Sequence, residues 1–210
     1  MSDGGTGADV SRLDEIAERL ARIELLLVGS LADELEGNEP PETAGAESLS
    51  LDAVGAAAAL TPAAEFERFV DRLGLPNFKG AEFTPYWTRV RNGVSNSAPD
   101  DDLWENVVPT LVVLQRFRTE TGSPVQLLST FRSSRYNKAI GGATHSQHTQ
   151  FRAIDFTVSS GTPAQWARRL RSYRGDEFTN PLGGSFTLRG GIGVYSGFVH
   201  LDTRGTVADW

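Results

Sequence analysis

The sequence predicts an α+β domain preceded by a separate acidic helix. Helical periodicity dominates the first half of the chain, short strand-like segments come mostly in the second half, and residues 36–62 are rich in Pro, Gly, Ala, Ser and Glu. Helices and strands segregated in this way are typical of an α+β fold. We therefore divide the 210 residues into a helical segment (1–35), a flexible linker (36–62) and a domain with a small antiparallel sheet and flanking helices (63–210).

The N-terminal segment has the pattern of an amphipathic helix from Val10 to Leu35. Its apolar residues recur at steps of three and four, with charges between them: Val10, Leu13, Ile16, Leu20, Ile23 and Leu27. The stripe fits a helix that mediates self-association or docking, and it fits equally a helix that packs on its own domain. The composition of the linker is that of a flexible, polar connection.

Charge is distributed unevenly along the chain. Residues 1–62 carry 13 acidic and 3 basic side chains, a net charge of -10, whereas residues 63–210 carry 14 acidic and 17 basic ones, a net charge of +3. The Lys and Arg residues are scattered rather than striped, which does not favour nucleic-acid binding. No apolar run reaches the roughly 18–20 residues that a membrane span needs. The polar, acidic start lacks the regions of a signal peptide, so we expect synthesis in the cytoplasm.

Periodicity and turn residues predict the elements of the domain in chain order. Helices are expected at Pro62–Leu73, Asp102–Thr121 and Pro163–Tyr173, with Pro109 starting or kinking the second. Gly122 and Pro124 end that helix. Strands are expected at Val125–Ser129, Ala153–Val158, Ser185–Leu188, Gly193–Tyr195 and Phe198–Asp202.

Cysteine is absent, so a metal site would have to consist of histidine and carboxylate ligands. Asp155 lies inside an apolar strand seven residues after His148, where a carboxylate is costly to bury unless a charged partner satisfies it. His200 and Asp202 share one face of a second apolar strand. Two such strands can bring an imidazole and a carboxylate together. His148, Asp155 and His200 are therefore candidate metal ligands, although each histidine alone could be a hydrogen-bonded core residue.

Two longer segments resemble the M15 family of zinc D-Ala-D-Ala peptidases, especially its murein endopeptidase and phage-lysin branch. Residues 129–155 (STFRSSRYNKAIGGATHSQHTQFRAID) contain a serine and arginine turn, Gly-Gly-Ala, Ser-x-His and Ala-x-Asp. Residues 190–210 (GGIGVYSGFVHLDTRGTVADW) contain Phe-Val-His-x-Asp and end on Trp. Both segments occur in the family's order, and the resemblance covers residues 102–210.

The resemblance implies a role for five residues. His148, Asp155 and His200 match the three zinc ligands, with water as the fourth, which is the open arrangement of a catalytic zinc. Arg132 matches an arginine that contacts the substrate's carboxylate or carbonyl, a task that suits a planar guanidinium. Ser146 would contact the substrate or support the ligands, or else stabilise the turn.

Two positions depart from the family pattern. Phe151 stands where the family usually has Gly, which raises the question of how the local backbone is shaped. Gly197 stands where many members have a Glu as general base. Asp202 is then the nearest carboxylate that could act as the base, or it could instead orient His200 through the ring N–H. His145 could assist proton transfer or simply face solvent.

The implied function is that of a zinc-dependent peptidoglycan peptidase, either a D,D-carboxypeptidase or an endopeptidase. Bacterial cell wall is the expected partner. The principal alternative is a non-catalytic zinc-fold module with a wall-binding or structural role in a phage virion or a secretion machine. Release of a phage lysin through a membrane pore would also fit the expected lack of a signal peptide.

Overall fold

The computed structural model describes residues 60–210. The helix expected at Val10–Leu35 and nearly all of the expected linker lie outside these residues. Within the part that is described, no helix is both long enough and apolar enough to cross a membrane.

Four α-helices occur in the described part of the chain, and their first turns follow from the sequence. They are α2 (Pro62–Arg72), α3 (Val108–Thr121), α4 (Ser134–Ala139) and α5 (Pro163–Ser172). The hydroxyl of Thr61 caps α2, and Thr162 forms a capping box with Gln165 at the start of α5. Both helices also have proline in the first turn, where its missing N–H leaves no hydrogen bond unmade.

The single helix expected at Asp102–Thr121 is two helices of different type. A 3-10 helix, η4 (Asp101–Val107), is followed directly by α3. Pro109 lies in the first turn of α3, because it has no N–H to donate to a preceding turn. Gly122 ends the helix in a left-handed conformation (φ 62°), as the sequence predicts.

The main sheet has five strands in the order β3-β4-β8-β7-β9. All neighbouring strands are antiparallel except β7 and β9. The strands are β3 (Val125–Ser129), β4 (Ala153–Val158), β7 (Gly191–Val194), β8 (Val199–Asp202) and β9 (Ala208–Asp209). The α+β prediction is confirmed, and the predicted bounds of β3 and β4 agree with the structure.

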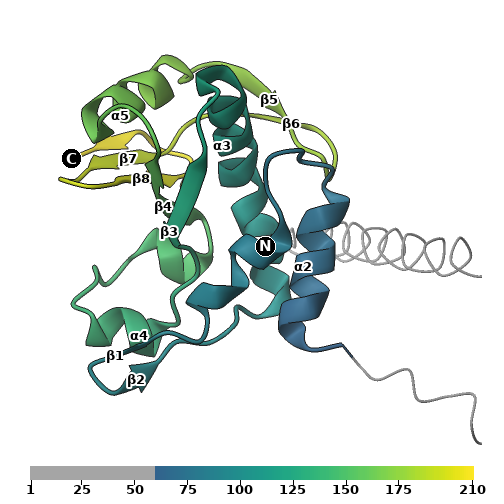
Figure 1. Cartoon of the computed structure of the whole chain (residues 1–210), viewed down its shortest axis with the longest axis vertical. Coiled ribbons are helices and arrows are strands. Elements are labelled where there is room, and N and C mark those ends of the chain that lie inside the picture. The colour runs from purple at the N-terminus through teal and green to yellow at the C-terminus, as the bar shows by residue number, and fades with distance from the viewer. Residues whose placement is uncertain (1–59) are drawn as a thin grey trace, which may run out of the picture. The chain divides into compact units, whose positions relative to one another are not determined.

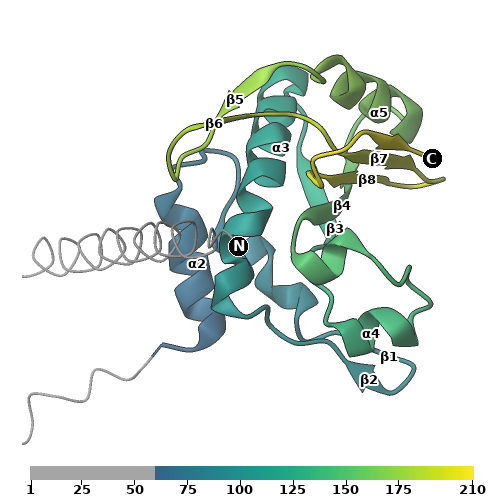
Figure 2. The same ribbon diagram turned by 180° about the vertical axis from the view of Figure 1, so that it is seen from behind.

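Two hairpins stand apart from this sheet. The strand expected at Ser185–Leu188 is β6 (Ser185–Thr187), and it pairs with β5 (Glu177–Thr179), a strand that was not predicted. The second hairpin consists of β1 (Val90–Arg91) and β2 (Val94–Ser95). Figures 1 and 2, which view the domain from opposite sides, show this hairpin beside α4 at the end of the domain away from α5.

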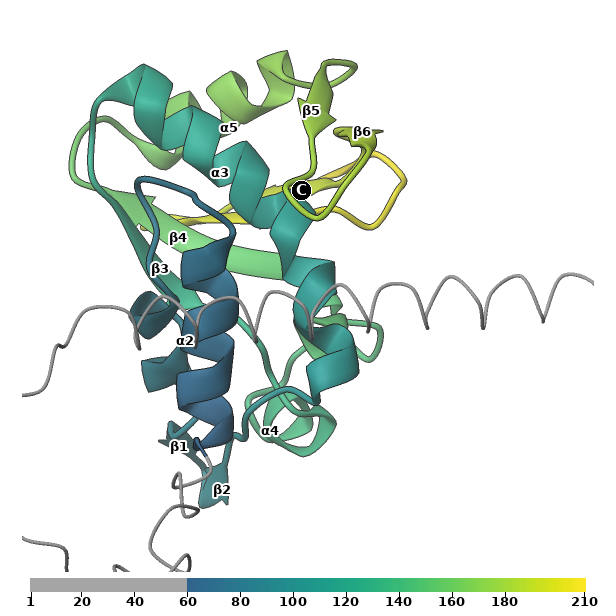
Figure 3. The ribbon, with the colours of Figure 1, turned by 90° about the vertical axis from the view of Figure 1, so that its right-hand side faces the viewer.

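The two faces of the sheet have different characters. Alternate residues such as Ile154, Phe156 and Leu201 are fully buried in the core. The ring of Phe117 in α3 packs edge-on against Phe156 at 5.7 Å between centroids, and Figure 3 shows α3 crossing the sheet. Asp155 and His200, which are paired directly across β4 and β8, project from the opposite face. Helices thus cover one face, and the polar side chains of the candidate site occupy the other.

The backbone conformation at Phe151 is one that favours glycine, the residue expected at this position from the family resemblance. Its backbone is left-handed (φ 52°, ψ 31°), a conformation that glycine adopts without strain. Its side chain is fully buried between the rings of Phe66 and Phe131, at centroid distances of 5.5 and 5.8 Å. The aromatic packing therefore offsets the backbone strain, and the turn that carries His148 into β4 keeps its shape.

This balance predicts an unusual order of stability. Phe151→Ala should lower the free energy of unfolding by about 3–5 kcal/mol, because it leaves a cavity and keeps a side chain at a left-handed position. Phe151→Gly leaves a similar cavity but relieves the strain, so it should be more stable than Phe151→Ala by about 1 kcal/mol. Urea denaturation of the three proteins measures this difference. If the alanine variant were the more stable of the two, the backbone of residue 151 would not be under strain.

Candidate metal centre

Three buried side chains from different segments converge on one point. His148 comes from the 3-10 helix η5 (Gln147–Gln150), Asp155 from β4 and His200 from β8. His148 Nε2 lies 3.1 Å from Asp155 Oδ1 and 3.2 Å from His200 Nδ1. His200 Nδ1 lies 2.8 Å from Asp155 Oδ1. The structure thus brings together the three residues that the sequence predicts as ligands.

The remaining ring nitrogens define how each imidazole carries its proton. His148 Nδ1 lies 2.6 Å from the carbonyl oxygen of Thr130, which can only accept, so Nδ1 is the donor. His200 Nε2 lies 3.0 Å from a carboxylate oxygen of Asp202 and donates to it. In a neutral ring the other nitrogen then has a free lone pair. His148 Nε2 and His200 Nδ1 therefore turn lone pairs toward the same point.

This arrangement of acceptors fits a metal ion. Two imidazole lone pairs and an ionised carboxylate oxygen would repel one another at these distances unless a cation lay between them. In a tetrahedral site with bonds of about 2.0–2.1 Å, neighbouring ligand atoms are about 3.3 Å apart. The observed distances of 2.8, 3.1 and 3.2 Å are close to that value. The three side chains therefore form a group that can hold a metal.

Electrostatics favours the protonation states that metal binding needs at His148 and Asp155. Burial lowers the pKa of His148, so its ring is neutral near pH 7. Burial acts to raise the pKa of Asp155, but its contacts with the two imidazoles outweigh burial and hold that pKa well below its usual range. A neutral imidazole and an ionised carboxylate are the forms that coordinate metals. Burial acts to lower the pKa of His200, but the carboxylates of Asp155 and Asp202 outweigh it and raise that pKa, so a metal would displace a proton from this ring.

Arg132 fixes the outer oxygen of the Asp155 carboxylate. Its Nη2 donates to Asp155 Oδ2, and its Nε donates to the Ser129 hydroxyl at 2.8 Å. Oδ1 of the same carboxylate is the oxygen nearest the two imidazoles. Arg132 thus orients a candidate ligand, a contact that sequence reasoning did not foresee, and it also lines the pocket next to the centre.

Asp202 contacts the His200 ring at Nε2, on the side opposite to Nδ1, which faces His148 and Asp155. It is fully buried, and its oxygens accept from the Gly191 N–H at 3.0 Å, from the Arg204 N–H and guanidinium, and from His200 Nε2. Burial acts to raise the pKa of Asp202, but Arg204, His200 and Gly191 together hold it well below its usual range. A general base works best with a pKa near the operating pH. Of the two roles expected for Asp202, the geometry favours orientation of His200.

The other sequence-predicted residues lie around the turn that precedes β4. Ser146 caps η5, and its hydroxyl accepts from the His148 N–H at 3.4 Å, which is the turn-stabilising contact considered for it. His145 is exposed. Asn137 in α4 is buried, and its side-chain amide donates to the Ala143 carbonyl at 2.9 Å, which shapes the loop between α4 and η5. A substrate contact of Ser146 stays a prediction.

Sequence reasoning missed several supports of the centre. The Arg204 guanidinium donates to both carboxylate oxygens of Asp202. Its place two residues after Asp202 in the sequence could have indicated this ion pair. At Gly191 an added Cβ would lie 2.4 Å from Asp202 Oδ2, so glycine is required for this close approach. The ring of Trp210 lies 5.2 Å from that of His200 and covers the edge of the centre.

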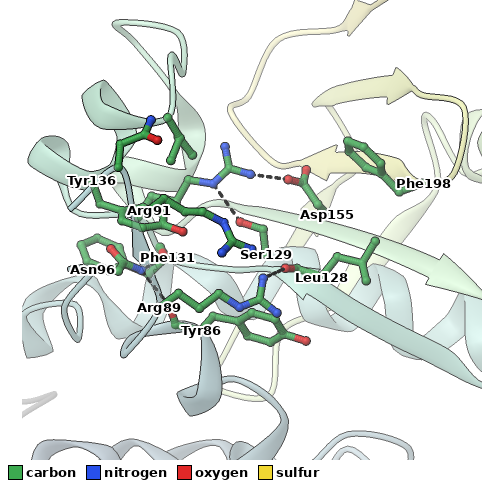
Figure 4. A pocket seen from close by; sticks show the side chains of 13 residues that line it. Tyr86, Arg89, Arg91, Asn96, Leu128, Ser129, Phe131, Tyr136, Asp155 and Phe198 are labelled. Atoms are coloured by element: carbon green, nitrogen blue, oxygen red, sulfur yellow. Dashed lines mark hydrogen bonds and ion pairs between the residues drawn. The ribbon is translucent and has the colours of Figure 1, made fainter. Parts of the chain in front are cut away.

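A pocket of about 410 Å³ opens beside the centre. Asp155 lines it, together with Arg132, Phe198 and residues from β3 and the β1–β2 hairpin. Figure 4 shows the side chains of Arg89, Arg91 and Tyr86 on one side of this space, with Asp155 and Phe198 on the other. A substrate bound in the pocket would therefore contact a candidate metal ligand directly.

Comparison with known proteins agrees with this geometry. The family model described as peptidase M15 matches residues 76–202, which is more than half of the chain and includes all three candidate ligands. Neither the curated proteins nor the solved structures provide a match. With its His-Asp-His group assembled across β4, β8 and the preceding turn, the chain belongs to the peptidase M15 family.

Proposed function

We propose that this protein is a zinc-dependent peptidase that hydrolyses the peptides of bacterial peptidoglycan. The observation that carries the proposal is the convergence of His148 Nε2, Asp155 Oδ1 and His200 Nδ1, all buried and all acceptors. Membership of the peptidase M15 family supports the peptidase activity and a substrate of the peptidoglycan type. The proposal covers a D,D-carboxypeptidase and an endopeptidase alike.

The donor set favours zinc. Two imidazole nitrogens and one carboxylate oxygen are ligands that zinc accepts, and three protein ligands leave one position open, as in catalytic zinc sites. When bound, zinc supplies a water of pKa near 7 and polarises the peptide carbonyl. The neighbouring residues keep the ligands in place: the Thr130 carbonyl holds His148, Arg132 holds Asp155, and Asp202 holds His200.

Arg132 has a second proposed role, toward the substrate. Nε and Nη2 of its guanidinium are engaged with Ser129 and Asp155, and Nη1 makes no hydrogen bond within the described residues that would keep it from a ligand. The residue also lines the pocket. We propose that Arg132 donates to a carbonyl or carboxylate of the bound peptide and so positions the bond to be cut. Ser146, at the turn before His148, is proposed as a further substrate contact.

Asp202 is proposed to orient His200, which leaves the proton acceptor to another group. Its carboxylate is enclosed by Arg204, Gly191 and the His200 ring, and it is fully buried. Among the residues predicted from sequence, the exposed imidazole of His145, three residues before His148, is the remaining candidate for the proton acceptor.

A non-catalytic role is favoured by two observations. Gly197 is exposed and has no side chain, so position 197 contributes no carboxylate, and Asp202 is fixed in an ion pair with Arg204. A zinc-fold module that binds wall without cutting it would tolerate both features. Either function is compatible with a linker at residues 36–62. Either is also compatible with docking of the Val10–Leu35 segment to a larger assembly, such as a phage virion or a secretion machine.

Digestion of purified peptidoglycan tests the proposed activity. The protein loaded with zinc should release peptide fragments that mass spectrometry identifies, chelation should abolish release, and added zinc should restore it. His200→Ala should stay inactive at any zinc concentration, because one ligand is gone. Cleavage by the chelated protein would contradict metal dependence. Sedimentation with peptidoglycan without any release of fragments would favour the non-catalytic alternative.

Asp202→Asn separates the two roles of Asp202. If it orients His200, zinc affinity should fall by roughly 10–100-fold and excess zinc should restore most of the activity. If it is the base, the variant should keep its zinc and lose roughly 10²–10⁴-fold in turnover. We expect the first result. Asp176→Asn is the matched control, since Asp176 makes an ion pair with Arg116 away from the centre and its loss should change neither quantity.

A further inference from the structure

The β1–β2 hairpin brings two more arginines to the pocket beside the centre. Asn92 and Gly93 connect its strands, and both have positive φ (51° and 72°), as a tight two-residue hairpin turn requires. Arg89 precedes β1 and Arg91 is its last residue. Both line the same pocket as Asp155 (Figure 4).

Neither hairpin arginine is neutralised by a carboxylate. Arg89 donates to the Leu128 carbonyl at 2.8 Å, and its guanidinium lies 4.2 Å from the centre of the Tyr86 ring. Arg91 donates one hydrogen bond within residues 60–210, to the neighbouring Val90 carbonyl at 3.4 Å. Among residues 60–210, neither makes an ion pair. Their contacts are with neutral groups, so both keep their full charge and most of their N–H donors.

The charge of the pocket is therefore strongly positive. Its charged lining consists of three arginines and one carboxylate, and that carboxylate, Asp155, is already engaged by Arg132 and the two imidazoles. Each guanidinium presents five N–H groups in a planar fork, of which Arg89 uses one on Leu128. Planar forks of this kind match carboxylates in bidentate geometry. The volume of about 410 Å³ lies in the range of small-ligand sites.

We propose that Arg89 and Arg91 form a carboxylate-binding subsite that selects substrates with a free carboxylate next to the peptide bond to be cut. The inference rests on the proposed function, because it places that bond at the centre formed by His148, Asp155 and His200. The carboxylate belongs to the substrate residue seated in the pocket, either as its main-chain terminus or as its side chain. Arg89 is held in place by Leu128 and Tyr86, whereas Arg91 is free to close on the ligand.

Amidation of the substrate tests the subsite. Soluble peptidoglycan fragments are compared with the same fragments after conversion of their carboxylates to amides. Wild type should lose roughly 10–100-fold in kcat/KM on the amidated fragments, mainly through KM, because hydrogen bonds to a charged group are lost. Synthetic peptides that are amidated only at the C-terminus, or only on a side chain, then identify which carboxylate is recognised.

The hairpin variants show whether the arginines are responsible. Two variants are compared, Arg91→Gln alone and the double variant that also carries Arg89→Gln. In both, kcat/KM should fall by roughly 10–100-fold on the free-acid fragments and change little on the amidated ones. Arg91→Gln is evaluated separately, because Arg89 also anchors the hairpin to Leu128. Arg68→Gln is the matched control: Arg68 is exposed on α2 and outside the pocket, so the same change of charge should leave both rates unchanged.

Two outcomes would overturn the subsite. One is equal cleavage of free-acid and amidated fragments by wild type, and the other is an equal loss on both by the arginine variants. If wild type cleaves neither substrate, the proposed function fails, and the subsite is judged by binding instead. In that case calorimetry with the same synthetic peptides should give a Kd roughly 10–100-fold weaker for the amide than for the acid, and equal Kd values would reject the inference.

Discussion

The carboxylate of Asp155 is buried against two imidazoles, and the other contacts of the site are arranged around it. Strand β4 places it directly opposite His200 on β8, on the face of the sheet that the helices leave free. A buried anion that faces two nitrogen lone pairs destabilises the folded protein, and a cation bound between them would offset that cost. Each of the three candidate ligands has a second hydrogen-bond partner: Arg132 on the outer oxygen of Asp155, the Thr130 carbonyl at His148 and Asp202 at His200. Contacts of this kind orient the ligands of metal sites.

The fold supplies rigidity where the centre needs it. Phe151 accepts a left-handed backbone because its ring is locked in the aromatic core, and this keeps the turn after His148 in register with β4. Gly191 admits the Asp202 carboxylate at a distance that any side chain would block. The β1–β2 hairpin lies outside the main sheet, yet it contributes the charge of the pocket. The centre is thus built on sheet and core, and part of the pocket beside it is built on a hairpin.

Sequence patterns could predict two of the candidate ligands, because a polar residue inside an apolar strand is itself a signal, as at Asp155 and His200. His148 lies outside a strand, and its prediction depended on the resemblance to the M15 family. Spacing could not decide the role of Asp202, because two residues on one strand face do not reveal which ring nitrogen of His200 each partner approaches. The proposed orienting role of Asp202 became visible only from its hydrogen bonds with Arg204 and with the Gly191 N–H. The hairpin was missed although Asn-Gly is a strong turn signal, since strands of two residues are too short to show alternation.

The assignment of one metal ion to these three side chains can be tested by diffraction from zinc-loaded crystals at the zinc absorption edge. It predicts one anomalous peak, about 2.0–2.2 Å from His148 Nε2, Asp155 Oδ1 and His200 Nδ1. Asp202 should stay on the far side of the His200 ring, outside bonding distance of the metal. No peak between the three ligands, or a metal bound through Asp202 in place of one of them, would contradict it.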